Sequence, residues 1–262
     1  MTTVWRDART GNPLKEAISA GTVLAGSFVR ILGAESVEVC AAAGADFVII
    51  DNEHQAFPDD GVSFVRAAEA AGTTPIIRTF NSNRETITRA LDTGAWGAMV
   101  PQIRSLEQAR AALDATRYLD GARGLAGNRA TGFGLRIPAA EYVAAADQNT
   151  FVVLQVEERG GLAAVEEIAA LPGYDVLFVG TSDMSVALGR PGDLANPELL
   201  DALRRVRDAA IGNGKALGLP VGSVEMAERY IEFGARFVAT GDVGLLAGAA
   251  RTFFAGVRAC SA

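Results

Sequence analysis

The side chains best suited to acid–base chemistry follow short apolar runs of the sequence. His54, the only histidine of the chain, comes three residues after Asp51, which ends one such run, and Arg78 stands near the end of the next run. An imidazole titrates close to neutral pH, so His54 is the natural candidate for a general base. A guanidinium stays charged, so Arg78 could hold a carboxylate or an enolate oxygen, and a salt bridge to a neighbouring acid is an equally good interpretation.

A second group of acids and amides follows two later apolar runs. Gln155 and Glu157 are two positions apart and face the same side of an extended strand, and Asp183 closes the following run. Charges inside an apolar fold are costly unless they are paired or bind a metal. With one histidine and two distant cysteines, the ligands must be mainly oxygens, which suits Mg²⁺ or Mn²⁺, with Co²⁺ or Zn²⁺ as substitutes. Glu157 and Asp183 are the predicted ligand pair, although each acid taken alone fits a helix cap or a loop residue better.

Eight short apolar runs alternate with longer amphipathic stretches and must position these residues. The runs are nearly continuous in apolar residues, which is typical of parallel strands buried on both faces. They cover 23–29, 45–51, 74–80, 97–103, 150–157, 176–183, 216–222 and 237–242. This pattern predicts a single α/β domain over residues 1–262, a (β/α)8 TIM barrel, with a doubly wound open sheet as the alternative. In a barrel, the polar residues named above would meet at the carboxyl ends of the strands.

The intervening stretches predict helices, several of which end in glycine, a common helix stop. They cover 34–44, 59–72, 82–94, 105–118, 161–173, 196–214 and 223–234. A Gly/Arg-rich insertion at about 119–149, with a helix around 139–149, interrupts the alternation. Long glycine-rich segments are often functional, and an ordinary surface excursion is the alternative. The C-terminal helix at 244–259 is too apolar for full solvation, so it is expected to pack on a neighbouring subunit or to close its own barrel.

Composition excludes several classes of protein. Of 262 residues, 49% are hydrophobic and 21% charged, so a large core can form and wholesale disorder is excluded. The net charge of −7 argues against nucleic acid or an anionic membrane as a partner. No apolar run is long enough for a membrane span, and MTTVWRDART has no signal-peptide character. Two cysteines, Cys40 and Cys260, are too few for a disulfide framework, so a reducing cytoplasm is the expected setting.

The scarcity of lysine separates two mechanisms of aldol chemistry. A Schiff-base enzyme needs a lysine amine in its active site. The chain has only Lys15, which precedes the predicted barrel, and Lys215, which stands at the amino end of the seventh predicted strand. Neither is at the active-site end, so Schiff-base and pyridoxal-phosphate chemistry are not expected. The sequence also has no Gly-x-Ser-x-Gly nucleophile elbow and no P-loop.

The segments that carry these residues resemble the HpcH/HpaI family of class II pyruvate aldolases, which includes 4-hydroxy-2-oxoheptanedioate and 2-dehydro-3-deoxyglucarate aldolases. The resemblance runs from about residue 13 to residue 258. It is carried, in order, by FVIIDNEH, PIIRTF, ALDTGAWGAMVPQ, RGLAG, VVLQVEERGG, LFVGTSDMSVALG and YIEFGARFVATGDVGLLA. It implies a carbon–carbon lyase that forms or cleaves 4-hydroxy-2-oxo acids from pyruvate, or hydroxypyruvate, and an aldehyde through a metal-stabilised enolate.

The resemblance also implies a role for each matched residue. His54 matches the catalytic base, and Asp92 matches the acid that raises the basicity of this histidine, by way of a subunit contact. Arg78 matches the transition-state stabiliser, and Asp51 matches a further active-site acid that works with the histidine. Gln155 and Ser182 match positions that contact the bound 2-oxo acid. Glu157 and Asp183 match the two metal ligands. Gly180 and Thr181 are expected to bind substrate as well.

The sequence departs from the family pattern at two places, and two other functions stay open. The family often has Gly at the position of Asn52 and Pro-Ala at Thr181–Ser182, so the pocket is expected to differ in shape. One alternative is a CoA-thioester lyase of the citryl- or malyl-CoA type, with the phosphates held by Arg123, Arg129 and Arg136. The other is a non-catalytic barrel used for binding or assembly. The resemblance further implies a hexamer built from dimers.

Overall fold

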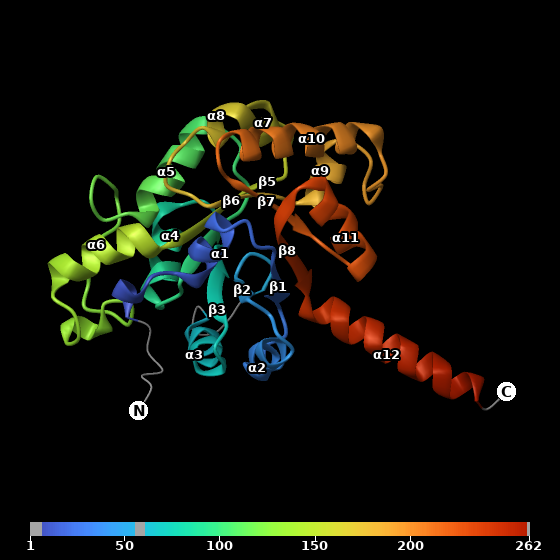
Figure 1. Cartoon of the computed structure of the whole chain (residues 1–262), viewed down its shortest axis with the longest axis horizontal. Coiled ribbons are helices and arrows are strands. Elements are labelled where there is room, and N and C mark those ends of the chain that lie inside the picture. Colours follow the sequence, from blue (N-terminus) through green and yellow to red (C-terminus); the bar gives the residue numbers. More distant parts are fainter. Residues whose placement is uncertain (1–6, 56–60, 261–262) are drawn as a thin grey trace.

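Eight parallel strands close into one barrel with strand order β1 to β8, as the sequence predicts, and the open sheet is excluded (Figure 1). This computed structural model describes residues 7–55 and 61–260. The start of the N-terminal segment MTTVWRDART and the first two residues of the helix predicted at 59–72 lie outside these ranges. The strands are β1 Leu24–Val29, β2 Phe47–Asp51, β3 Thr74–Arg78, β4 Gly97–Val100, β5 Phe151–Val156, β6 Val176–Val179, β7 Ala216–Pro220 and β8 Ala235–Gly241.

Aromatic and aliphatic side chains fill the inside of the barrel. The rings of Phe47 and Phe237 stack with centroids 4.0 Å apart, and Phe151 and Phe178 pack around them. Room for these rings comes from glycine, because a Cβ on Gly26 would strike the ring of Phe47. A packed interior leaves the carboxyl rim of the strands as the place for a site.

Helices cover the outside of the barrel. They are α1 Pro13–Ser19, α2 Glu35–Ala42, α3 Val62–Ala71, α4 Arg84–Asp92, α5 Leu106–Thr116, α6 Ala139–Asn149, α7 Arg159–Ala163, α8 Val165–Ala169, α9 Thr181–Ala187, α10 Pro197–Gly212, α11 Val224–Phe233 and α12 Asp242–Ala259, with short 3-10 turns η1 Ala8–Thr10 and η2 Gly132–Gly134.

Three predicted elements need correction. The strand predicted over 97–103 ends at Val100, because Pro101 has no N–H for the sheet and Gln102 has a left-handed backbone (φ 56°). The strand predicted over 176–183 ends at Val179, because the chain leaves the sheet at Gly180 and Thr181 begins α9. The helix predicted over 161–173 is two short helices, α7 and α8, which meet where Ala164 departs from helical geometry (φ −99°, ψ 12°).

The insertion at 119–149 packs at the amino end of its own barrel. It leaves the carboxyl end of α5 and returns to the start of β5, and helices run opposite to strands in this fold. The side chain of Asn149 donates to the carbonyl of Ala8 (2.8 Å), and Asn12 donates to the carbonyl of Asn149 (2.9 Å). A buried ion pair between Arg129 and Glu69 of α3 adds a further anchor. The part of the insertion that carries these contacts, from Arg129 to Asn149, therefore lies at the end opposite to the active-site rim of the same chain.

The last helix, α12, extends away from the barrel (Figure 1). Of its residues, only Asp242 at its first position is buried. Its exposed apolar side chains are Val243, Leu245, Leu246, Phe253, Phe254 and Val257. The expectation that α12 closes its own barrel is therefore wrong. Among the described residues, no helix has both the length and the apolar character needed to cross a membrane.

Candidate active site

A pocket of about 480 Å³ opens at the carboxyl rim of the barrel. His54 lines it from the loop after β2, Glu157 from the end of β5, and Asp183 from the first turn of α9. The wall also includes Glu53 and Gln102. Three residues that stand in separate segments of the sequence are thus brought to one cavity, as the barrel prediction requires.

Arg78 is held by two acids on the neighbouring chain segment. Asp51 and Arg78 lie side by side in the register of β2 and β3. Arg78 Nε and Nη2 donate to the two Asp51 carboxylate oxygens (2.8 and 2.6 Å), and Nη1 lies 2.9 Å from Glu53 Oε2. The Phe28 ring packs 4.7 Å from the guanidinium carbon. The predicted salt bridge is therefore present. Two of the five N–H donors of this guanidinium bond to Asp51, and Glu53 adds an ion pair without a hydrogen bond.

His54 stands at the open side of this cluster. Its side chain is 50% exposed, and its backbone N–H donates to Asp51 Oδ1 (3.3 Å). Its Nε2 lies 3.9 Å from Glu53 Oε2. Among the acids of the described ranges, Glu53 is the one that forms an ion-pair contact with this imidazole, and the ring remains accessible to a ligand in the pocket.

Glu157 is a buried carboxylate with two donors and an excess of negative charge around it. Only 2% of the residue is exposed. Its Oε1 accepts the backbone N–H of Gln102 (2.8 Å), and its Oε2 accepts the side-chain amide of Gln155. Burial is the main cause that raises the pKa of Glu157 to about 8, and the negative charges of Glu53 and Asp183 raise it further. The ionised form of Glu157 therefore lacks enough positive charge nearby to balance its own negative charge.

The floor beside Glu157 depends on the absence of a side chain at Gly180. A Cβ at this position would collide with Glu157 Oε2 and lie 2.9 Å from Gln155 Nε2. The next residue, Thr181, is buried, whereas Ser182 is exposed like Asp183. Gly180, Thr181 and Ser182 thus connect β6 to the first turn of α9, where Asp183 lines the same pocket as Glu157.

The donors in this pocket fit a hard divalent cation better than a structural zinc ion. Among residues 7–55 and 61–260, no group of three or more His, Cys, Asp or Glu side chains has metal-site geometry. The predicted pair, Glu157 and Asp183, would leave most positions of an octahedral ion to water or substrate, as is usual for Mg²⁺. Gln155 Oε1 is buried and has no hydrogen-bond partner among the described residues, so it is an acceptor in need of a donor such as water.

Sequence and structure comparisons place the chain among known proteins. The sequence profile described as HpcH/HpaI aldolase/citrate lyase matches residues 24–249. The chain belongs to this family. It is 37% identical over 246 residues to a 4-hydroxy-2-oxovalerate aldolase of Rhodococcus jostii, with 90% of this chain and 92% of the relative covered. It is 33% identical over 240 residues to a 5-keto-4-deoxy-D-glucarate aldolase of Shigella boydii, with coverage of 89% and 91%.

Solved structures agree with this assignment. An HpcH/HpaI aldolase/citrate lyase family protein from Burkholderia cenocepacia superposes with a TM-score of 0.88 at 35% identity, over 94% of this chain and 99% of the other. An HpcH/HpaI aldolase from Desulfitobacterium hafniense superposes with a TM-score of 0.87 at 28% identity, over 94% and 96%. The resemblance read from the sequence is confirmed, and so is the prediction of a carbon–carbon lyase.

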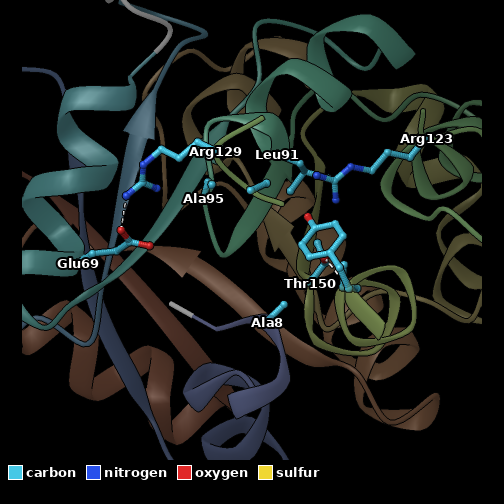
Figure 2. Close-up of a pocket in the computed structure, with 11 residues that line it drawn as sticks. Ala8, Glu69, Leu91, Ala95, Arg123, Arg129 and Thr150 are labelled. Carbon is cyan, nitrogen blue, oxygen red and sulfur yellow. Dashed lines mark hydrogen bonds and ion pairs between the residues drawn. The ribbon is translucent and has the colours of Figure 1, made fainter. Parts of the chain in front are cut away.

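Asp92 is not brought to the HpcH/HpaI site of its own chain. It ends α4, which leads into the amino end of β4, so it lies at the face opposite to His54. Its Oδ1 lies 3.4 Å from Nη2 of the buried Arg123 of the insertion. Figure 2 shows Arg123 on one side of a small pocket at this face, and Arg129 on the other side pairs with Glu69.

Both lysines also lie at the amino face. Lys15 Nζ pairs with Asp175, which precedes β6, at 2.7 Å. Lys215 Nζ donates to the carbonyl of Tyr174 (3.0 Å) and lies 4.5 Å from the centre of its ring. Since the sequence contains no other lysine, the pocket at the carboxyl rim has no amine for a Schiff base.

Sequence reasoning missed Glu53 and Gln102. Glu53 stands directly before His54, and this position could have indicated that it belongs to the site. Its contact with Arg78 follows only from the fold. Gln102 follows Pro101 at the end of a predicted strand. Nothing in the sequence shows that its backbone turns toward Glu157.

Proposed function

We propose that the protein is a divalent-metal-dependent aldolase that reversibly cleaves 4-hydroxy-2-oxo acids to pyruvate, or hydroxypyruvate, and an aldehyde. The observation that carries this proposal is the buried Glu157 with a pKa raised to about 8 in the same pocket as Asp183 and His54. The names of the relatives, 4-hydroxy-2-oxovalerate aldolase and 5-keto-4-deoxy-D-glucarate aldolase, support the same class of substrate.

Glu157 and Asp183 would hold the cation, with Mg²⁺ or Mn²⁺ favoured and Co²⁺ or Zn²⁺ as substitutes. Bound there, a dication would supply Lewis-acid polarisation of a 2-oxo acid. It would also offset the electrostatic repulsion between Glu157 and the negative charges of Glu53 and Asp183. Gln155 would orient Glu157 through its amide and offer its free oxygen to a donor in the pocket.

His54 would act as the general acid–base group, directly or through a water. In cleavage, His54 would take the proton of the 4-hydroxyl as the C3–C4 bond breaks, which gives the aldehyde and leaves the electron pair of the bond on the enolate of pyruvate. His54 would then protonate C3, and in synthesis it would remove the same proton. Arg78, fixed by Asp51 and Glu53, would use its remaining N–H donors on the enolate oxygen. Gly180, Thr181 and Ser182 would line the 2-oxo acid.

Assembly would bring further residues to the site. Asp92 can support a histidine only in another copy, because it lies at the opposite face of its own barrel. The apolar face of α12 is exposed in the single chain and would be covered by a neighbouring subunit. We propose a homo-oligomer, a hexamer built from dimers. Sedimentation velocity tests the stoichiometry.

The alternative of a CoA-thioester lyase finds little support. Two of the three arginines suggested for the phosphates, Arg123 and Arg129, are already paired with acids at the amino face. The alternative of a non-catalytic barrel does not explain why a base, a guanidinium and several acids converge at one pocket. Competition between CoA esters and pyruvate separates the first alternative from the aldolase. The cytoplasmic location remains a prediction.

The test is metal-dependent exchange of the methyl protons of pyruvate in D₂O, followed by proton NMR. We expect exchange with Mn²⁺ or Mg²⁺ and none with EDTA. Exchange that survives EDTA would contradict the proposal. Borohydride with pyruvate should trap no covalent adduct, because both lysines lie at the other face. A panel of aldehydes with pyruvate and hydroxypyruvate then identifies donor and acceptor.

A further inference from the structure

Gln102 has an unusual backbone in the wall of the active-site pocket. Among the described residues, three that are not glycine have positive φ: Gln102 (56°), Asp120 (53°) and Phe133 (58°). Only Gln102 of these three lines the pocket at the carboxyl rim. A left-handed backbone is unfavourable for a residue with a side chain, and such residues gather at functional sites.

The left-handed turn redirects one backbone N–H. After β4, Pro101 has no N–H to give, and the N–H of Ile103 returns to the carbonyl of Gln155 on β5 (3.0 Å). Between them, the N–H of Gln102 donates to Glu157 Oε1 at 2.8 Å instead of joining the sheet. The conformation thus supplies a donor to a carboxylate that is only 2% exposed.

The side chain of Gln102 binds a second acid of the pocket, Glu53. Its Nε2 donates to Glu53 Oε1 (2.8 Å), and its Oε1 accepts from Arg104 Nη2 (2.8 Å), which fixes which end of the amide faces Glu53. The other oxygen of Glu53 lies 2.9 Å from Arg78 Nη1 and 3.9 Å from His54 Nε2. One residue therefore contacts both the predicted metal ligand and the acid between the guanidinium and the imidazole.

We propose that Gln102 is a positioning residue with two separable parts. Its left-handed backbone orients the carboxylate of Glu157 toward the cation site. Its side-chain amide orients the carboxylate of Glu53 toward Arg78 and His54. The proposal rests on the proposed aldolase function for its second part. It requires no contact between Gln102 and the reacting atoms.

Two substitutions separate the parts. Gln102→Gly removes the amide but adopts positive φ freely, so we expect the Kd for Mn²⁺ to change by less than about threefold. Gln102→Val also removes the amide, and its β-branched side chain disfavours the left-handed region, so we expect its Kd to be at least about tenfold weaker than that of the glycine variant. Mn²⁺ binding is measured by electron paramagnetic resonance and isothermal titration calorimetry on the full chain.

A third substitution tests the amide with the backbone intact. Gln102→Met keeps the length of the side chain and the N–H but loses the hydrogen bond to Glu53. We expect kcat for pyruvate proton exchange to fall at least about tenfold, with a smaller change in KM and in the Kd for Mn²⁺. A purely structural role would lower the amount of folded protein and leave kcat per folded molecule unchanged.

Asp120 offers a matched control, because it has the same kind of backbone away from the pocket. Asp120→Gly and Asp120→Val should differ in thermal stability and not in Mn²⁺ affinity. Equal Mn²⁺ affinities for Gln102→Gly and Gln102→Val would overturn the first part, and wild-type kcat in Gln102→Met would overturn the second. Absence of exchange in the wild type would instead reject the aldolase function, and the Mn²⁺ comparison would still decide the backbone part.

Discussion

The two ends of the barrel treat buried charge in opposite ways. At the amino face, Asp175 accepts Lys15 Nζ at 2.7 Å and the backbone N–H of Val152 at 2.8 Å, so its charge is matched. At the carboxyl rim, the acids around Arg78 outnumber it, and the pKa of Glu157 rises to about 8 because of burial and neighbouring negative charge.

The difference shows which end is built for stability and which for chemistry. A matched charge costs the fold little stability, whereas an unmatched buried charge costs more and is retained where a ligand completes it. The sign of the missing charge is informative, because a surplus of carboxylates calls for a cation. The contrast can be tested by removing charge at either end and measuring activity and stability separately.

The largest loss of activity is expected from the acids that would hold the cation. Glu157→Gln keeps the shape and removes the charge, and it should lower metal-dependent pyruvate exchange by about a thousandfold or more, equivalent to about 4 kcal/mol of transition-state stabilisation. Asp183→Asn should have a similar effect. NMR in D₂O measures the rate. The metal-free Glu157→Gln protein should be at least as stable as the wild type, and a large loss of Tm would argue against an unmatched charge.

The next largest loss is expected from the general base. His54→Asn should lower exchange by about 10²–10⁴-fold, the usual contribution of acid–base catalysis. Because the imidazole is half-exposed and is not a predicted ligand, the Kd for Mn²⁺ should stay within about twofold. A parallel loss of Mn²⁺ binding would show that His54 belongs to the metal site instead.

A smaller, graded effect is expected from pH. In the metal-free protein the pKa of Glu157 is raised to about 8 from an ordinary value near 4.5, so the folded state holds this proton more tightly than the unfolded state. Its stabilising contribution is full below pH 4.5 and is lost as pH rises through 8. A cation needs the carboxylate form, so its Kd should weaken up to about tenfold per pH unit below 8.

Calorimetry in buffers of different ionisation enthalpy should detect the proton released on Mn²⁺ binding at pH 7. The Glu157→Gln variant should lose this proton release. A Kd for Mn²⁺ in the wild type that does not change between pH 6 and pH 8 would show that Glu157 is already ionised in the metal-free protein.

Much of this architecture could be predicted because buried parallel strands leave apolar runs in the sequence. The ends of the predicted runs 45–51 and 150–157 agree with the ends of β2 and β5 to within two residues. The turn at Gly180 could not be read in the same way, because the polar residues Thr181–Asp183 also fit the polar end of a strand. Only the fold shows that Glu157 and Gln155 occupy the space where a side chain at Gly180 would be.

The site was predictable in its residue types and not in its pairings. His54, Arg78, Glu157 and Asp183 could be chosen because they follow strand ends and match family motifs. The bond from Gln102 to Glu157 depends on a backbone angle, and no pattern of residue types specifies that angle. Asp92 shows a different limit, because its predicted role requires a second copy of the chain.

The smallest effect is expected at the amino face, and it completes the contrast. Lys15→Met removes one partner of a half-buried ion pair and should lower the free energy of unfolding by about 1 kcal/mol, because Asp175 keeps its bond from Val152. Chemical denaturation measures this change. The rate of pyruvate exchange per folded molecule should not change, since the lysine lies at the end opposite to the pocket. Loss of exchange in this variant, at unchanged Mn²⁺ affinity, would mean that the amine takes part in the reaction and that the division between the two ends is wrong.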